Sequence, residues 1–558
     1  MRRYLTIAVC VLLVALYSTA ETRVIDVKPM GKASATDYLR KQLRGIKGTD
    51  SVRIVFGKGD FYMDGNVDII CNAEVSGAGR KATRIFIQNS PNHTDDCFLG
   101  FKARRPATTA VRLHDLSMKT EPHDGLWWTE PEMRYAVKIC YAHSVTVERV
   151  DIEVDNAYIG NLDTRVCSNI VVRDCVLKNF NNCHAGGGLS VRGDTHNVLI
   201  EKNEFYKYGN DEMLSIFGYF DETYSYKVSY PDTCYKTNIR VNKNKFFAGG
   251  YKGKNPTDTI IDTYFTFLLY KIGDDHVVNI ADGFDFTDNE FHIDVPMHNL
   301  ITVTFDKYTH HRGVRFSGNK VTYTKNAGQA DSWYDDFCIR DTSIGSDSIY
   351  IHDNTFDVAC DWESSWGDNN YSHLSMSGGN VSYYNNTFTD RGTVPAFSNR
   401  DYTGCNLVTF REEGGNVMLR NNTVKGLYLL ARLSEASQVA PSRLDARDNY
   451  FEGNTRIHCG NAARLDLNMV NNTIRCRDGG FLLDTWAQTG TLSLLRNNIS
   501  CAKPAGPLMV NWSGANPNDM TFERVEVVGN RFTNVDPSQL LNGIRHISHR
   551  IVGNNRFY

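Results

Sequence analysis

The chain has 558 residues, of which 41% are hydrophobic and 22% are charged, and its formal net charge is −3. This composition is typical of a globular protein with a large core, and it excludes a disordered or fibrous chain. The slightly acidic balance argues against a nucleic-acid-binding protein, because such proteins are usually basic.

The first twenty residues predict a secretory signal peptide. Two arginines precede an apolar run from Ile7 to Leu16, and small residues at positions 18 and 20 suit cleavage near Ala20. No later stretch approaches the roughly 18 continuous apolar residues of a membrane span. We therefore expect a protein without a transmembrane segment that is secreted or located in the periplasm or at the cell surface. We also expect it to be a monomer.

Residues 21–50 are expected to form an N-terminal cap. The segment "SATDYLRKQLRGI" (34–46) predicts an N-capped amphipathic helix with Leu39, Leu43 and Ile46 on one face. Such a helix would cover the open end of a repeat structure, where unpaired strand edges invite aggregation. The rest of the chain, residues 51–558, is expected to be one catalytic domain.

A short strand-like sequence motif, called a word below, recurs along this domain. "NVLIEKNEF" (197–205) returns as "NVSYYNNTF" (380–388), "NVMLRNNTV" (416–424) and "RLDARDNYF" (443–451). Its asparagine recurs at intervals of 23 to 45 residues, whereas Val150 and Cys175 hold the same place in two earlier words. The asparagines are Asn203, Asn244, Asn289, Asn319, Asn354, Asn386, Asn422, Asn449, Asn472, Asn498, Asn530 and Asn555.

A short repeat of this kind predicts one coil of a solenoid, in which each coil buries its apolar face on the next. The words alternate with period 2 and are rich in Val, Ile, Phe and Thr, which excludes helical repeats. An asparagine just after a strand suits a turn in the left-handed region, which Asn tolerates better than other non-glycine residues. We therefore expect an all-β solenoid of roughly 12–14 coils.

These words and their asparagines resemble the right-handed parallel β-helix of the pectate-lyase-like superfamily, in which an asparagine ladder marks the turn between the second and third strands. The resemblance covers about residues 50–558. It implies a secreted enzyme that acts on polysaccharides, with the substrate groove on the strand that follows the next bend.

The 14 cysteines show no CxxC pairs, and Cys175 and Cys338 stand in strand-like words. Both buried packing and a few disulfides stay open for them.

A second set of words, such as "GLSVRG" (188–193) and "FCIRDT" (337–342), marks the expected groove strands. Their alternation predicts a solvent-facing set of side chains, subject to a one-residue register error that would turn each to the core. Longer coils between Asn203 and Asn289 carry Tyr-rich and Lys-rich insertions that would wall the groove, or would simply pack on the flank of the solenoid. The predicted outward residues are Arg192, Arg340, Arg411, Arg432, His458, Asp484 and Trp486.

Two segments carry groups that bind anions or move protons: "NCHAGGGLSVRGDTH" (182–196) with the next coil, and the bend "FDKYTHHRGVRF" (305–316). From these segments we expect catalytic roles for His184, Arg192, Lys307, Tyr308, His310 and His311. Substrate binding is assigned to Trp128, His196, Tyr208, Arg312, Arg340, Arg411 and Arg432. Ca²⁺ is the candidate cofactor, with Asp211 and Glu212 as its ligands. Exposed turns without function are the alternative interpretation of each segment.

A third, acidic set could hydrolyse a glycosidic bond or hold Ca²⁺. It consists of Asp274, Asp275, Asp282, Asp285, Asp335, Asp336 and Asp341.

Arginine, lysine, tyrosine and histidine suit a lyase that cleaves an acidic polysaccharide, glycosaminoglycan-like or pectic, by β-elimination. Such a lyase must neutralise a uronate carboxylate and supply a base and an acid. A glycoside hydrolase with paired aspartates is the first alternative, although the chain lacks the Gly-His-Gly word of pectin-degrading hydrolases. A non-catalytic glycan-binding protein is the second.

Overall fold

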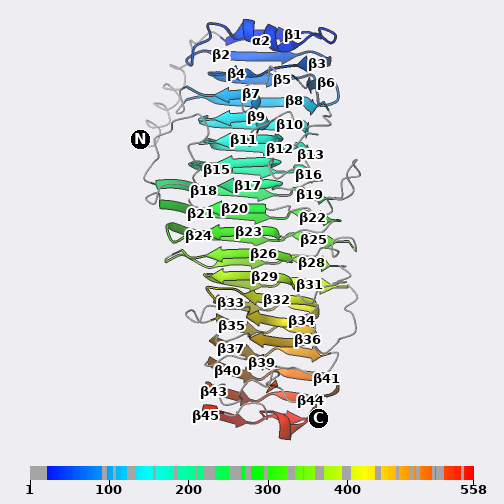
Figure 1. Cartoon of the computed structure of the whole chain (residues 1–558), viewed down its shortest axis with the longest axis vertical. Helices are drawn as coiled ribbons and strands as arrows, with labels where there is room; N and C mark the ends of the chain where they lie inside the picture. The colour runs from blue at the N-terminus through cyan, green and yellow to red at the C-terminus, as the bar shows by residue number, and fades with distance from the viewer. Residues whose placement is uncertain are drawn as a thin grey trace, which may run out of the picture.

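The computed structural model shows a parallel β-helix, as the repeated words predict. It describes residues 22–88, 90, 97–104, 108–121, 134–154, 159–180, 187–207, 212–217, 233–249, 265–269, 278–294, 299–324, 334–343, 345–358, 370–391, 404–433, 442–459, 464–476, 483–485, 490–505, 509–510, 521–541 and 546–558. The strands stack along one long axis, with β1 at one end and β45 at the other (Figure 1). Every strand ladder is parallel, and each strand pairs with its counterpart on the next coil.

The strands form three parallel sheets that run along the axis, and each sheet makes up one side of every coil. The first sheet contains β1 (Thr22–Val27), β2 (Ser51–Phe56), β5 (Asn72–Ser76), β8 (Ala110–Thr120), β10 (Ser144–Val154), β12 (Ser168–Arg173), β15 (Thr195–Glu201), β18 (Thr233–Asn242), β21 (Val278–Thr287), β24 (Thr309–Ser317), β27 (Ile349–His352), β30 (Asn380–Tyr384), β33 (Gly415–Arg420), β35 (Ser442–Arg447), β37 (Leu465–Val470), β40 (Gly490–Leu495), β43 (Thr521–Val528) and β45 (His546–Gly553).

The second sheet includes the later parts of β8 and β10. Its other members are β3 (Gly59–Met63), β6 (Thr83–Ile87), β13 (Val176–Asn179), β16 (Glu204–Lys207), β19 (Lys245–Ala248), β22 (Glu290–Ile293), β25 (Lys320–Tyr323), β28 (Thr355–Val358), β31 (Thr387–Asp390), β34 (Thr423–Leu433), β36 (Tyr450–Cys459), β38 (Thr473–Cys476), β41 (Asn498–Ala505), β44 (Arg531–Val535) and β46 (Arg556–Phe557).

The third stack, which we call the groove sheet, also takes in the ends of β34 and β36. It contains β4 (Val67–Ile69), β7 (Cys97–Lys102), β9 (Arg134–Cys140), β11 (Ile159–Arg165), β14 (Leu189–Arg192), β17 (Leu214–Phe217), β20 (Phe265–Leu269), β23 (Asn299–Phe305), β26 (Tyr334–Asp341), β29 (Asn370–Gly378), β32 (Gly404–Phe410), β39 (Leu483–Thr485) and β42 (Met509–Val510).

The core is one continuous column of apolar side chains inside the coils. In β15 the inward Val198 and Ile200 are buried and their neighbours are more exposed, whereas in β14 of the groove sheet both faces are buried. Rings stack in register along the axis, for example Phe205 on Phe246 with centroids 4.7 Å apart. Because the coils are about 4.8 Å apart, like residues at like positions give continuous contacts. Cys175 and Cys338 are buried and carry free thiols.

The described strands of the first sheet give more coils than the 12–14 expected, because the coils from β2 to β10 carry no ladder asparagine. Helix α2 (Ala35–Leu43) and the 3-10 turn η3 (Pro537–Gln539) are also present. The predicted helix is confirmed: the Ser34 side chain accepts a hydrogen bond from the Thr36 amide at 3.1 Å, and Leu39 is buried. Helix α2 packs against β3 and β4 at the N-terminal end (Figure 1).

The asparagine ladder links the first and second sheets at their shared corner. The Asn244 side chain accepts from the Asn203 amide at 3.0 Å and donates to the Ile200 carbonyl at 2.9 Å. The pattern repeats to Asn555, with one correction: Asn497, not Asn498, occupies the ladder. The spacing of the repeat agrees with Asn497, because Leu492 and Leu494 precede it and Ile499 follows it as Val198, Ile200 and Phe205 flank Asn203.

We expected the ladder asparagines themselves to adopt the left-handed conformation at the turn, and this expectation was wrong. The residue before each ladder asparagine takes the positive φ, as Lys202 (56°), Lys243 (55°) and Asp353 (56°) do. The ladder asparagine itself supplies hydrogen bonds, because its amide pairs backbone groups that the corner leaves without strand partners.

Candidate functional site

The outer face of the groove sheet carries a row of small polar residues. In-register pairing places Ser190, Ser215, Thr266, Thr302, Cys338, Ser375 and Thr409 side by side on successive strands. At about 4.8 Å per coil, these positions span roughly 30 Å. The Ser190 and Ser215 hydroxyls are hydrogen-bonded at 3.0 Å. Ser190, Ser215, Cys338, Ser375 and Thr409 are buried, so the row is a covered polar strip that follows the axis.

A charged group lies at the N-terminal end of this row. We call it the lysine cluster: Tyr135, Lys138, Asp163, Arg165 and Arg192. Lys138 and Asp163 occupy the position of the row itself, and Arg165 and Arg192 lie two residues further along their strands. Strand alternation points all four side chains outward.

Asp163 holds the lysine cluster together. Its carboxylate lies 2.6 Å from Arg165 Nε and 3.1 Å from Arg192 Nε. Arg192 Nη2 also donates to the Tyr135 hydroxyl. Tyr135, Lys138 and Asp163 are buried, whereas the Arg165 side chain is 12% exposed. Arg165 is therefore the member that meets solvent most.

Burial changes the protonation of this cluster. Burial is the main cause, and the positive charge of Arg165 a smaller one, that together lower the pKa of Lys138 from 10.5 to about 8; the negative charge of Asp163 opposes this shift. Burial also raises the pKa of Tyr135 well above its usual range, so the phenol stays protonated. The Asp163 pKa is lowered although burial opposes this, because Arg165 and Arg192 stabilise its charge. A proton acceptor and a proton donor thus lie beside two fixed cations.

A second charged group, the carboxyl cluster, lies further along the same face. Its members are Asp335, Cys338, Arg340, Ser375 and Arg411. Arg411 Nη2 donates to Asp335 Oδ2 at 2.9 Å, and Arg411 Nε donates to the Ser375 hydroxyl. Arg340 is exposed. Burial raises the pKa of Asp335 to about 6, although Arg411 lowers it.

The predicted bend at 305–312 does not join the lysine cluster. Arg192 ends β14 and Phe305 ends β23, which is three strands away through β17 and β20, or about 14 Å along the axis. Lys307 and His310 are exposed, and Tyr308 lies 4.9 Å from the Lys307 ammonium. The two segments share an edge of the groove sheet, but they do not form one cluster.

His311 points into the solenoid, because its position in β24 is an inward one. It is buried, stacks on Phe305 at 4.4 Å and contacts Asp341 at 2.9 Å. Its exposed neighbour Arg312 pairs with Asp282. Only part of the bend therefore faces solvent as expected: Arg312 is on the outer face of β24, whereas His311 is on the inner face.

The acidic set is also separated by strand alternation and corners. Asp335 faces outward, whereas the buried Asp336 binds Tyr323 and His373 inside the solenoid. Asp341 binds His311 and Ser343 at the next corner. Asp274 and Asp275 lie outside the described residues. Among the described members of the acidic set, the structure therefore does not bring the carboxylates into one cluster.

The remaining predicted residues divide into three groups. His196 lies on the first sheet, just past the corner that follows β14, with Nδ1 2.8 Å from the Thr237 hydroxyl. Glu212 precedes β17, and its carbonyl accepts from the Gly188 amide. His184, Trp128, Tyr208, Asp211 and Trp486, and the side chains of Arg432, His458 and Asp484, lie outside the described part of the chain.

Among the described residues, no group of three or more His, Cys, Asp or Glu side chains could hold a metal ion. Within the same residues, no helix is long and apolar enough to span a membrane.

The sequence analysis missed Tyr135, Lys138 and Asp163. A signal was present for the lysine: Lys138 alternates with Val137 and Ile139 in "RYAVKIC", which marks it as the outward residue of a buried strand. For Asp163 the alternation is the same, but its partner Arg192 lies on the next coil, and nothing in the sequence shows that the two residues are neighbours.

Comparisons with known proteins give no family model and no curated protein that matches the chain. Among solved structures, the catalytic domain of a GH87 alpha-1,3-glucanase in complex with nigerose is similar, with 10% identity and a TM-score of 0.29 over 96% of this chain and 68% of that one. The tailspike gp61 of Pseudomonas phage phi297 has 10% identity and a TM-score of 0.33 over 92% and 83%. The PL6 family alginate lyase AlyGC has 10% identity and a TM-score of 0.20 over 96% and 100%.

Proposed function

We propose that the protein degrades an acidic polysaccharide by β-elimination on the outer face of the groove sheet. The observation that carries this proposal is Lys138, whose pKa burial lowers to about 8, on the strand that carries Tyr135 and in register with Asp163, which holds Arg165 and Arg192 at the end of the polar row. A base with a pKa near working pH is what proton abstraction requires.

Each part of the elimination has a matching group in the lysine cluster. Arg165 and Arg192 would pair with the C5 carboxylate of a uronate, which makes the C5 proton more acidic. The neutral Lys138 amine takes that proton, the C5 electron pair forms the C4–C5 double bond, and the C4–O bond breaks. The Tyr135 hydroxyl, which stays protonated because burial raises its pKa, donates a proton to the leaving oxygen.

The polar row would hold the rest of the polymer. The hydroxyls of this row, interrupted by the Cys338 thiol, would supply hydrogen-bond partners to successive sugar residues if the polymer displaces what covers them. Arg340, exposed at the far end of this row, would bind a second carboxylate. The most exposed member of the lysine cluster, Arg165, would be the first to contact the uronate that reacts.

The test is a panel of uronate polymers, including alginate, pectate, chondroitin sulfate and hyaluronan, followed by the ultraviolet absorbance of the unsaturated product. We expect activity on at least one polymer, with kcat/KM rising as pH increases through about 8. The K138A variant should lose the activity, whereas K245A, at an exposed lysine of the second sheet, should keep it. Full activity in K138A would refute the assignment of the base.

One observation favours hydrolysis as a second candidate. Asp335, with its pKa raised to about 6 and Arg411 beside it, is a carboxyl suited to general acid catalysis on the same face. New reducing ends without absorbance, lost in D335N but retained in K138A, would establish this reaction instead of the elimination.

A further inference from the structure

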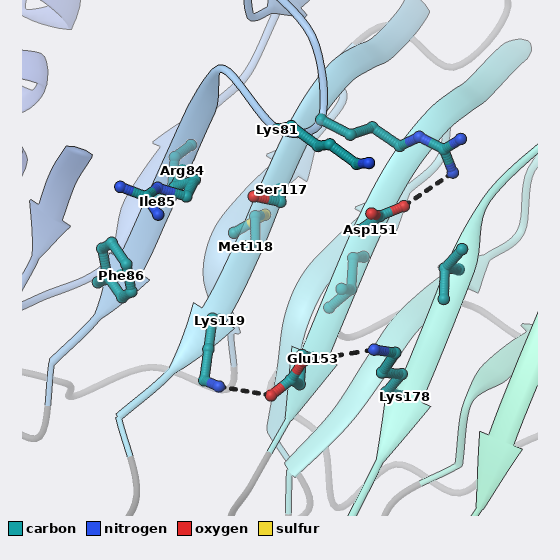
Figure 2. Close-up of a pocket in the computed structure, with 13 residues that line it drawn as sticks. Lys81, Arg84, Ile85, Phe86, Ser117, Met118, Lys119, Asp151, Glu153 and Lys178 are labelled. Carbon is teal, nitrogen blue, oxygen red and sulfur yellow. Dashed lines mark hydrogen bonds and ion pairs between the residues drawn. The ribbon is translucent and has the colours of Figure 1, made fainter. Parts of the chain in front are cut away.

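A second charged surface lies on the outer face of the second sheet, away from the groove sheet. It is a hollow of about 470 Å³ formed by β6, β8, β10 and β13. Five cationic side chains line it, and we call it the basic hollow: Arg80, Lys81, Arg84, Lys119 and Lys178. Figure 2 shows these strands side by side, with the labelled lysines and Arg84 around the opening.

The register of the sheet arranges the lining in two rows across the coils. Arg84, Ser117 and Asp151 are paired in one row. The other row consists of Phe86, Lys119, Glu153 and Lys178 (Figure 2). Lys119 and Lys178 stand on either side of Glu153, two coils or about 10 Å apart.

The cations of the hollow exceed its carboxylates. Arg80 pairs with Asp151 at 2.9 Å, and Glu153 is shared by Lys119 at 2.6 Å and Lys178 at 3.8 Å. Arg84 pairs with Asp60 on the preceding coil. Lys81 is exposed and has no carboxylate partner among the described residues. Five positive charges therefore face three negative ones, in a chain whose net charge is −3.

These ion pairs leave the cations accessible. The side chains of Arg84, Lys119 and Lys178 are 56%, 45% and 40% exposed. Exposed pairs of this kind contribute little to stability, so their cations can bind another anion at small cost. The half-buried Phe86 ring stacks on Tyr62 at 5.4 Å and borders the cations with an apolar surface. Charged groups beside aromatic rings suit a sugar that carries sulfate or carboxylate groups.

We propose that the basic hollow is a non-catalytic binding site for a sulfated or carboxylated polysaccharide. The site lies on a different sheet from the lysine cluster and does not depend on the proposed reaction. It would let the solenoid hold an anionic polymer on one side while the groove sheet remains free.

The experiment measures binding of dextran sulfate by isothermal titration calorimetry at fixed ionic strength, with neutral dextran as the control polymer. Dextran sulfate has no uronate carboxylate, so it cannot undergo the proposed elimination. In the variant K81Q/R84Q/K119Q, we expect the Kd to rise at least tenfold. Higher salt should weaken binding to the wild-type protein more than binding to the variant.

The matched control is K245Q/K320Q/R531Q, which removes the same charge from exposed positions of the same sheet outside the hollow. Its Kd should change less than twofold, and K138A should bind like the wild type. Equal losses in the two triple variants would overturn the proposal, because they would indicate diffuse attraction. Binding of neutral dextran with the same affinity, or full displacement by inorganic sulfate at the same sulfate concentration, would also overturn it.

Discussion

Replacing Lys138 by methionine should stabilise the protein while removing its proposed activity. Burial lowers the pKa of Lys138 from 10.5 to about 8, so the folded state holds the lysine's charge at a cost. Since one pKa unit corresponds to about 1.36 kcal/mol, this cost is on the order of 3 kcal/mol below pH 8. Methionine fills a similar volume without a charge, and Asp163 keeps Arg165 and Arg192 as partners.

The sign of the pH dependence follows from the lowered pKa. The protonated lysine is disfavoured in the folded state, so the cost is fully present below the folded pKa of about 8. It disappears as the pH rises toward 10.5, where the lysine loses its proton in the unfolded chain as well. The advantage of K138M should therefore be largest near pH 7 and should shrink toward pH 10.

Urea unfolding followed by circular dichroism at pH 7 and pH 10 measures this difference. Hydrogen exchange of the β9 and β11 amides adds a local measurement, because each coil of a solenoid contacts mainly its neighbours. The control K245M removes an exposed lysine paired with Glu290 at 3.7 Å, and it should change the free energy of unfolding by less than about 0.5 kcal/mol. A K138M protein that is less stable than the wild type at pH 7, or a gain that does not depend on pH, would refute the reasoning.

Three further predictions concern stability. In N386A the buried Asn354 amide and Ile351 carbonyl lose their partners, so unfolding in urea should become easier by about 2–5 kcal/mol, against less than about 1 kcal/mol for the exposed N416A. Because the Asp335 pKa is raised to about 6, wild-type stability should fall as pH rises from 4 to 6, and thermal melts of D335N should lack this fall; an identical profile would contradict it. In H373L the buried Asp336 loses its partner at 2.6 Å, and the free energy of unfolding measured with a denaturant should drop by about 3–5 kcal/mol, whereas an unchanged free energy would show that the contact contributes nothing.

The repeated word was sufficient to predict the fold. A period-2 pattern of apolar residues followed by asparagine indicates a strand and a corner, and stacking follows because a single coil cannot bury its own face. The ladder from Asn203 to Asn472 was therefore predicted residue by residue, and the N-capped helix expected within 34–46 forms at Ala35–Leu43. At 497 and 498 the prediction chose the wrong asparagine, although the apolar spacing of the repeat fits Asn497.

The candidate site was predictable only in part. Alternation correctly placed Arg340 and Arg411 on the outer face of the groove sheet. It could not show that Arg192 is buried there against Asp163 and Tyr135, because those partners come from other coils. It also failed at the bend, where one step in register turns His311 inward and leaves His310 outside.

The sequence by itself thus determined the repeat, the ladder and the outward rows, since these depend on local periodicity that each coil repeats. Only the tertiary structure decided which charged residues become neighbours. Asp163 and Arg192 are 29 positions apart in the sequence and Asp335 and Arg411 are 76 apart, and the length of each intervening coil sets their register. Burial then decided their chemistry, because a lysine such as Lys138 acquires a pKa near 8 only when the folded chain removes it from water.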